Sequence, residues 1–205
     1  MPDVARRAFD ELLGAIARND VALVTALIDD GADPNAADHP DDRPAWSVLA
    51  EAAYRDAVGD RSARLVEVLL DAGADPNPSG YPPLLMCINQ MGTSVPGLRR
   101  LLDAGADPDV VNPADGDTLV HRVTQIGSDE SVELVLSLGL SLERRDGRGR
   151  TPLLAAVHQE NPAAVRRLVA AGTDTTAVDD DGRTAEQLAE DSKRTDELLA
   201  ALTAG

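Results

Sequence analysis

LLDAGADPN, at positions 69–77, is a phrase that this chain repeats with small changes. Close copies are LIDDGADPN at 27–35 and LLDAGADPD at 101–109, and more diverged copies are VLSLGLSLE at 135–143 and LVAAGTDTT at 168–176. The phrase predicts the end of a helix, because its Gly readily becomes left-handed and its Pro cannot continue a helix. The glycines lie at 31, 73, 105, 139 and 172, so the spacings are 42, 32, 34 and 33 residues. A period near this value indicates an array of repeats.

Composition limits both the core and the partner. The 205 residues are 43% hydrophobic but only 2% aromatic, so the core must consist of Leu, Val, Ala and Ile in thin, stacked layers of helices. The formal net charge of −17 argues against nucleic acid as a partner, because a basic face is needed to bind phosphates. The acidity either keeps an elongated array soluble or steers a basic partner.

Cysteine content and hydropathy bear on the compartment. Cys87 is the only cysteine, which excludes an intrachain disulfide and a Cys-rich metal site. We interpret it as a small buried hydrophobic residue rather than a nucleophile. The sequence contains no apolar stretch of 18 residues and no signal-peptide pattern near Met1, so we expect a cytoplasmic protein without membrane contact. Heavy use of Ala, Asp and Arg, with Lys193 as the single lysine, is typical of a GC-rich bacterial genome.

Apolar residues at helical spacing predict a pair of helices in each unit. In the first pair Phe9, Leu12 and Ile16 share one face, and the charged outer face is typical of a terminal cap. The predicted units cover approximately residues 3–35 as an N-terminal cap, 36–77, 78–109, 110–143, 144–176, and 177–205 as a C-terminal cap.

Two of these units depart from the regular pattern. Residues 56–61 look like an extension inserted between two helices, which accounts for the long first spacing. The turn before Tyr81 is about three residues shorter than the corresponding turn of the sixth unit. After this turn the sequence predicts a first helix over residues 84–89 and a loop over 91–94.

The opening and closing phrases of the units occur in register. GRTPLLAA at 149–156 and GRTA at 182–185 open two units, and LDAGADPN at 70–77 closes another. This combination resembles the ankyrin repeat family over the whole chain. The resemblance implies an all-α ankyrin repeat solenoid, with stacked helix-turn-helix units, β-hairpin-like linking loops and terminal capping repeats, as a single domain over residues 1–205. It also implies that His121 hydrogen-bonds the hairpin backbone and has no catalytic role.

Two positions differ from the family motif. Leu119 stands where the family has Pro, so we expect the first helix of the fourth unit to start less firmly. We interpret Trp46 as the replacement of the motif's Leu in the second unit, where it fills the core or the groove.

The sequence lacks the usual patterns of a catalytic or metal site. His39, His121 and His158 lie in different units, and neither an HExxH motif nor a Gly-rich phosphate loop is present. The run Asp179–Asp181 could hold a cation loosely, but an acidic turn is the commoner structure. We therefore predict no catalytic residue, no metal and no cofactor.

In ankyrin proteins the hairpin tips and the inner faces of the first helices form a concave groove that binds partners, and we expect the same here. Trp46 and Tyr81 either mark the edge of the contact site or cover the gap left by the short turn. The arginines of residues 144–150 either orient an acidic patch of the partner or neutralise nearby carboxylates. The predicted partner-binding residues are Asp41, Arg43, Trp46, Glu51, Tyr81, Asn89, Gln90, Asp115, Asp117, Gln125, Ile126, Arg145, Arg148, Arg150, His158 and Gln159.

The sequence thus predicts a monomeric, non-catalytic module that binds another protein through the concave groove. An alternative is an antitoxin-like or immunity-like inhibitor of a basic enzyme, because complementary charge speeds association. A third hypothesis is a small-molecule binder or an enzyme with a pocket near the inserted extension and His158.

Overall fold

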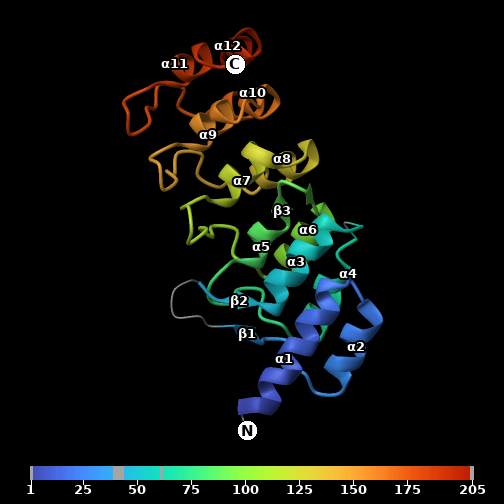
Figure 1. Cartoon of the computed structure of the whole chain (residues 1–205). Coiled ribbons are helices and arrows are strands. Elements are labelled where there is room, and N and C mark those ends of the chain that lie inside the picture. The colour runs from blue at the N-terminus through green and yellow to red at the C-terminus, as the bar shows by residue number, and fades with distance from the viewer. Residues whose placement is uncertain (1, 39–43, 61, 204–205) are drawn as a thin grey trace. The chain divides into compact units, whose positions relative to one another are not determined.

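The computed structural model describes residues 2–38, 44–60 and 62–203, which form paired helices and two short pairs of antiparallel strands (Figure 1). The chain divides into two compact units, Met1–Pro113 (unit 1) and Ala114–Gly205 (unit 2). The helices of unit 1 are α1 (Pro2–Ala17), α2 (Val21–Asp29), α3 (Val48–Val58), α4 (Arg64–Asp71), α5 (Pro83–Met86) and α6 (Val95–Asp103). Those of unit 2 are α7 (Leu119–Ile126), α8 (Asp129–Leu136), α9 (Pro152–His158), α10 (Pro162–Ala170), α11 (Ala185–Glu190) and α12 (Thr195–Leu202).

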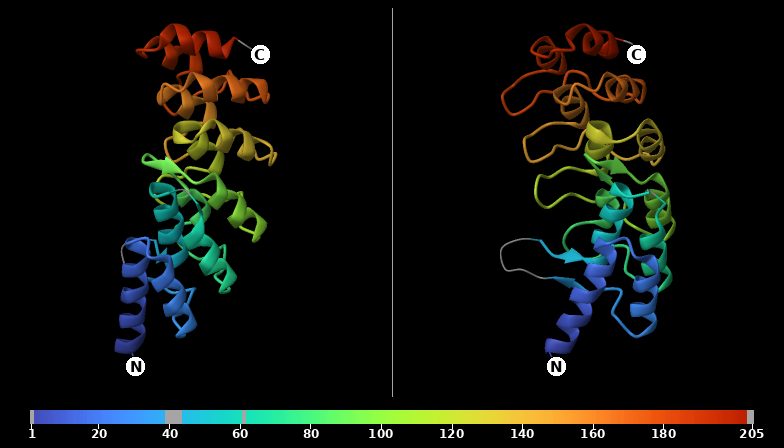
Figure 2. Two further views of the ribbon diagram at one scale, coloured as in Figure 1. Left: turned by 90° about the vertical axis from the view of Figure 1, so that its right-hand side faces the viewer. Right: turned by 45° about the vertical axis from the view of Figure 1, so that its right-hand side comes forward.

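Within each unit the first and second helices of the repeats form separate layers. In unit 1, α1 packs on α3 and α3 on α5, while α2 packs on α4 and α4 on α6. In unit 2, α7 packs on α9 and α9 on α11, while α10 contacts both α8 and α12. The loops that precede α9 and α11 project from the same side of unit 2 (Figure 2). The predicted stacking of helix-turn-helix units is confirmed.

Aliphatic side chains fill the layers, as the composition predicts. Leu49, Leu69 and Leu84 of unit 1 are fully buried, as are Leu153 and Leu168 of unit 2. Burial of a Leu side chain contributes about 1.5–3 kcal/mol, so these layers are the main source of stability. None of the helices among the described residues is both long and apolar enough to cross a membrane.

The repeated phrase closes a helix and also joins one repeat to the next. Gly73 has a φ of +88°, the left-handed conformation expected after the end of α4. The side chain of Asn77 donates to the carbonyl oxygen of Gly105 at 2.9 Å and accepts from the amide of Asp107 at 2.7 Å. Asn35 makes the same pair of bonds to the following phrase. The phrase therefore fixes the spacing of consecutive repeats.

The predicted inserted extension over residues 56–61 is partly wrong. Asp56, Ala57 and Val58 continue α3, and the buried Asp56 carboxylate accepts hydrogen bonds from Leu65 N at 3.4 Å and Val66 N at 3.0 Å. Ala63, the residue before α4, has a φ of +64° and no side chain that could cap the helix. Asp56 supplies this cap from the preceding helix.

The predicted helix over residues 84–89 is also partly wrong, because only residues 84–86 of it are helical. The helix α5 ends after one turn, and β3 (Ile88–Asn89) then pairs with β4 (Gly92–Thr93). Part of the predicted loop at 91–94 is therefore a strand. Asn89 accepts a hydrogen bond from Met91 N at 2.9 Å, which favours a tight turn over continuation of the helix.

Two expectations from the family motif require correction. Ser47, at the end of β2 (Trp46–Ser47), is the N-cap of α3, so Leu49 occupies the position of the motif's Leu and Trp46 precedes the motif. The helix α7, which is the first helix of the fourth repeat, does not start weakly. Thr118 and His121 form a reciprocal capping box at its first turn. This box satisfies two amide groups and compensates for the missing Pro.

Candidate functional site

The Trp and both Tyr residues of the chain belong to unit 1 and are joined by contacts. The ring centroids of Trp46 and Tyr81 lie 5.2 Å apart at an interplanar angle of 64°. The short turn brings Tyr81 to this position, because Tyr81 N donates to Ala45 O at 3.0 Å. Gly80 has a φ of +101°, and an added Cβ would lie 2.2 Å from Ala45 O. Only glycine permits this close approach.

An ion pair extends the aromatic pair along α3. Glu51 accepts a hydrogen bond from Trp46 Nε1 at 2.8 Å and pairs with Arg55 Nε at 2.6 Å. The Arg55 guanidinium carbon lies 5.7 Å from the centroid of the Tyr54 ring. The Tyr54 hydroxyl lies 3.8 Å from the sulfur of Met91, whose exposed fraction is 64%. We call this continuous set of side chains the aromatic surface; it comprises Trp46, Glu51, Tyr54, Arg55, Tyr81 and Met91.

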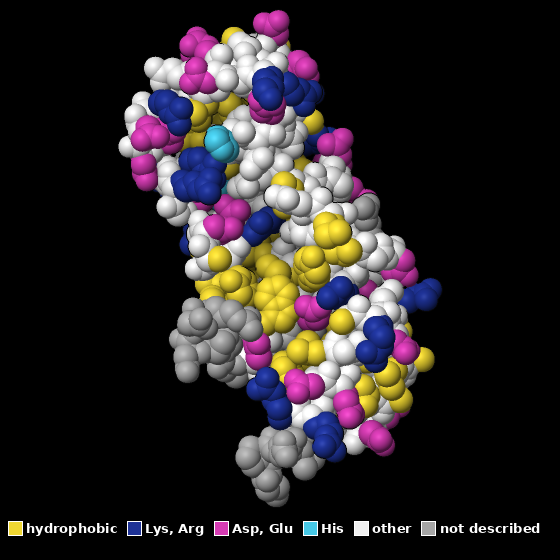
Figure 3. Space-filling view, in the orientation of Figure 1, with side chains coloured by type: hydrophobic (Ala, Val, Ile, Leu, Met, Phe, Trp, Pro, Cys, Tyr) yellow, Lys and Arg dark blue, Asp and Glu magenta, His cyan; other side chains and the backbone are white. Residues whose placement is uncertain are grey.

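The aromatic surface adjoins a neutral part of an acidic chain. Residues 76–98 contain no Asp, Glu, Lys, Arg or His, although 27% of the chain is charged. The space-filling view shows hydrophobic side chains gathered over β2, α5 and the β3–β4 hairpin (Figure 3). Depletion of charge and enrichment of aromatic residues are typical of the centre of a protein interface. Neither Tyr54 nor Met91 was among the predicted partner-binding residues, but this uncharged stretch was visible in the sequence.

The remaining predicted residues of unit 1 lie around this surface. Asn89 and Gln90 lie on the β3–β4 hairpin rather than on a first helix, and Gln90 is exposed. Asp41 and Arg43, together with His39, lie outside the described residues.

In unit 2 a first group of predicted residues forms a polar cluster before and along α7. Asp117 is buried and accepts a hydrogen bond from Gln125 Nε2 at 3.1 Å. Burial, and then the negative charge of Asp115, raise the pKa of the Asp117 carboxyl. Asp115 is exposed and lies 3.5 Å from a guanidinium nitrogen of Arg122, while Ile126 is half-buried at the end of α7. Asp117 therefore has a mainly structural environment.

In the arginine-rich loop of unit 2, some arginine side chains are held by hydrogen bonds within the unit and others are exposed to solvent. Arg150 forms a two-pronged bond with the Asp146 carboxylate, at 2.7 and 2.9 Å. Burial alone would raise the pKa of the Asp146 carboxyl. The hydrogen bonds that it accepts, chiefly from Arg150, outweigh the effect of burial, so the pKa of Asp146 is lowered. Arg145 donates to the carbonyl oxygen of Val178 at 2.6 Å. Arg148 is exposed, and its guanidinium forms no ion pair within the part of the chain that the structure describes.

Next to this loop lies a small pocket of about 130 Å³ lined by Arg148, Arg150, His158 and the acidic turn at 179–181. Burial and then the nearby arginines lower the pKa of His158. His158 and Gln159 are exposed. Asp179 Oδ1 accepts backbone hydrogen bonds from Asp181 and Arg183, so the run is an acidic turn. Residues 2–38, 44–60 and 62–203 contain no group of His, Cys, Asp or Glu side chains arranged to hold a metal.

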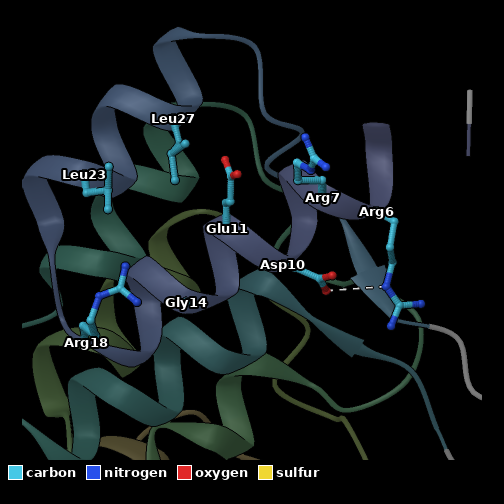
Figure 4. Close-up of a pocket in the computed structure, with 8 residues that line it drawn as sticks. All are labelled: Arg6, Arg7, Asp10, Glu11, Gly14, Arg18, Leu23 and Leu27. Carbon is cyan, nitrogen blue, oxygen red and sulfur yellow. Dashed lines mark ion pairs between the residues drawn. The ribbon is translucent and has the colours of Figure 1, made fainter. Parts of the chain in front are cut away.

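A larger pocket of about 570 Å³ lies on α1 and α2 (Figure 4). Arg6 and Asp10 form an ion pair of 3.5 Å across its rim, with side chains 73% and 58% exposed, so this pair contributes little to stability. The lining residues are Arg6, Arg7, Asp10, Glu11, Gly14, Arg18, Leu23 and Leu27. Their charged character agrees with the polar terminal cap predicted for the first helix pair.

Comparisons with known proteins agree on the architecture. Residues 84–179 match the family model for ankyrin repeats, in three copies. A chain in the solved complex of the predatory endopeptidase Bd0816 from Bdellovibrio bacteriovorus with immunity protein Bd3460 is 23% identical, with a TM-score of 0.77 over 93% of this chain and 97% of that chain. The ankyrin repeat domain ABAYE2397 from Acinetobacter baumannii AYE is 25% identical, with a TM-score of 0.72 over 93% of this chain and 96% of that domain.

A curated relative matches a shorter region. Protein phosphatase 1 regulatory subunit 27 from Mus musculus is 34% identical over 74 residues, which is 36% of this chain. The match spans about half of the relative, 47% of its length.

Proposed function

Since this chain is an ankyrin repeat protein, we propose that it is a non-catalytic module that binds a protein partner through its hairpin tips and first helices. Similar chains occur in a complex of an endopeptidase with its immunity protein and in a phosphatase regulatory subunit, which supports a binding role. We also propose that residues 1–205 act as one cytoplasmic, monomeric domain with a concave binding groove.

One observation carries this proposal, namely the aromatic surface of unit 1. Trp46 and Tyr81 are only half-buried, although large rings gain most from full burial. Their positions are fixed by the Glu51 hydrogen bond and the Tyr81–Ala45 backbone bond. Rigid, partly exposed Trp and Tyr side chains are the commonest hot spots of protein interfaces.

Affinity capture from the source organism's extract tests this site. Protein with both Trp46→Ala and Tyr81→Ala should lose the captured partner, because two hot spots together contribute at least about 4 kcal/mol. A matched control with Arg18→Ala and Leu23→Ala alters the pocket of α1 and α2 and should keep the partner. Thermal unfolding of both variants checks that each remains folded. Retention of the partner by the folded aromatic variant would contradict the proposal.

Unit 2 carries its own set of exposed predicted residues. Arg148 and His158 line one small pocket, Gln159 follows His158 in the chain, and the Arg148 charge is not neutralised by an ion pair with a described residue. We expect Arg148→Ala to weaken partner binding less than Tyr81→Ala does, since exposed charges contribute about 0–1 kcal/mol.

Inhibition of a basic enzyme is a second candidate function. The net charge of −17 favours it, as does the similarity to a chain from a complex that contains an immunity protein. Once the partner is in hand, its association rate should fall steeply as salt rises, because long-range attraction is screened. An association rate that does not depend on salt would reject this function while leaving the binding role intact.

A further inference from the structure

We infer that the aromatic surface recognises a segment of a protein partner that carries a basic side chain and an apolar side chain about one helical turn apart. The inference rests on the proposed binding function and specifies its partner. It follows from three features of unit 1: the ring geometry at Trp46, the carboxylates beside it, and the exposed thioether on the β3–β4 hairpin.

The basic side chain is selected at the Trp46–Tyr81 pair. The two rings meet edge to face and both are only half-buried, so part of the aromatic pair stays accessible beside the Glu51 carboxylate. A second carboxylate, Asp38, accepts a hydrogen bond from Trp46 N at 3.2 Å. A guanidinium or ammonium group is attracted both by an aromatic face and by adjacent carboxylates. Both carboxylates contact Trp46, Glu51 at the indole nitrogen and Asp38 at the backbone amide, so this position attracts a cation more than an anion.

The arrangement of charges around this position supports the same selection. Arg55 is the cation of the aromatic surface, and its ion pair with Glu51 has no net charge, so the long-range charge around the surface comes from the rest of unit 1. Residues 1–113 contain 19 acidic and 9 basic side chains, so the surroundings of the surface are negative. A basic partner is therefore attracted at long range as well as at contact.

The apolar side chain is selected at the other end of the surface. Met91 lies at the tip of a hairpin, is 64% exposed and touches the Tyr54 hydroxyl through its sulfur. A thioether adapts to apolar groups of different shapes, so it provides contact area without demanding one shape. The neighbours of Met91 along the chain are uncharged, because residues 76–98 contain no charged side chain. An acidic side chain would lose hydration here, and the nearby cation, Arg55, is already paired with Glu51.

Each end of the surface is anchored on α3, Trp46 by its hydrogen bond to Glu51 and Met91 by its contact with Tyr54. These two anchors are separated by three positions on α3, which is close to one turn, or about 5 Å along the helix. Side chains at i and i+4 of a partner helix have a similar separation. A partner helix with Arg or Lys four positions from Leu thus reaches both ends together.

The single tryptophan of the chain lies in this site, so its fluorescence reports occupancy directly. The probes are three helical peptides built mainly from Ala and Gln. Each carries one Leu, and the residue four positions after this Leu is Arg in the first peptide, citrulline in the second and Glu in the third. We expect a saturable change of Trp46 emission with the Arg peptide, about tenfold weaker binding of the citrulline peptide, and weaker binding still of the Glu peptide.

Variants separate the two ends of the surface. Glu51→Gln should keep a hydrogen-bond acceptor for Trp46 but remove the preference for Arg over citrulline. Met91→Ala should weaken binding of all three peptides by a similar factor and keep that preference. Arg18→Ala, on the α1–α2 pocket, should change neither property.

Two results would overturn the inference. One is equal affinity for the Arg, citrulline and Glu peptides, and the other is an unchanged Trp46 emission with all three at millimolar concentration. If the captured partner of the full chain still depends on Trp46 and Tyr81 in either case, the proposed function stands and only this partner chemistry fails. If the partner is insensitive to both aromatic substitutions, the proposed function fails too.

Discussion

Replacement of Asp56 by Asn should change how the stability of unit 1 depends on pH. The Asp56 side chain is buried, with a relative exposure of 1%, where its carboxylate caps α4 by accepting from the amides of Leu65 and Val66. Burial raises its pKa from 3.8 to about 6, and the charges of Asp60 and Glu67 add to this rise, while the two amide hydrogen bonds oppose it. The Cys87 thiol, also buried nearby, remains neutral.

The magnitude follows from linkage between protonation and folding. Between pH 3.8 and about pH 6 the unfolded chain has lost the Asp56 proton and the folded chain retains it. Stability contributed by the protonated carboxyl is therefore fully present below pH 3.8 and is lost as pH rises through about 6. A difference of about two pH units corresponds to about 3 kcal/mol of unfolding free energy. Asn does not titrate, so Asp56→Asn removes this loss.

Urea unfolding followed by Trp46 fluorescence measures this effect in unit 1. The stability of the original protein relative to Asp56→Asn should fall by about 2.5 kcal/mol between about pH 4 and about pH 8, and most of the fall should occur below about pH 6.5. Because both proteins share every other titrating group, those contributions cancel in the comparison. If the original protein instead gained stability relative to Asp56→Asn as pH rose, the amide hydrogen bonds would outweigh desolvation and the reasoning would be refuted.

Other substitutions test contacts between and within repeats. His121→Ala should destabilise unit 2 by about 2–4 kcal/mol in chemical unfolding, because the buried ring lies 2.9 Å from the Arg150 carbonyl oxygen and caps its own helix. Burial lowers the pKa of His121, so its stabilising effect should disappear as pH falls, while His121→Gln should remove this pH dependence. Asn77→Ala should cost about 1–2 kcal/mol in urea unfolding, since its two bonds to the next phrase include a donation to Gly105. Cys87 should resist a thiol reagent until the protein unfolds, because burial raises the pKa of its thiol.

Specific outcomes would contradict these expectations. A His121→Ala protein as stable as the original would show that the ring's hydrogen bonds are offset by its desolvation. Unchanged stability of Asn77→Ala would mean that water replaces both bonds at this exposed position. Rapid labelling of Cys87 in folded protein would show that α5 and the β3–β4 hairpin open readily in solution.

The repeated phrase predicted the architecture well, because each of its residues has a local physical role. A left-handed Gly such as Gly73 and a helix-terminating Pro act through their own backbone, so a single sequence reveals them. The assignment of His121 to the hairpin backbone is confirmed by its bond to Arg150 O. The burial of Cys87 is likewise confirmed.

The predictions failed where a distant residue decides the local structure. Asp56 looked like part of an inserted loop, but it caps a helix that begins eight positions later, at Arg64. Residues 84–89 read as a helix because Leu84 and Leu85 suit one, whereas the β3–β4 pairing and the bond from Ser94 N to Cys87 O stop it. Tertiary pairing overrides local propensity in both cases. For the candidate site, Trp46 and Tyr81 could be selected from sequence, but Tyr54 and Met91 could not.

The irregular features of unit 1 meet at one place, and this coincidence favours function over chance. In the shortened turn, Gly80 approaches the backbone of Ala45 closely, and Tyr81 N donates to Ala45 O. This contact places the Tyr81 ring against Trp46, and a turn of normal length would not make it. The interrupted first helix of the same repeat produces the hairpin that exposes Met91. Neither change improves the stack, because one shortens a hairpin and the other removes turns of helix from the packed layer. Stability alone gives no reason to place both beside an uncharged stretch and the chain's single tryptophan, whereas a binding surface does.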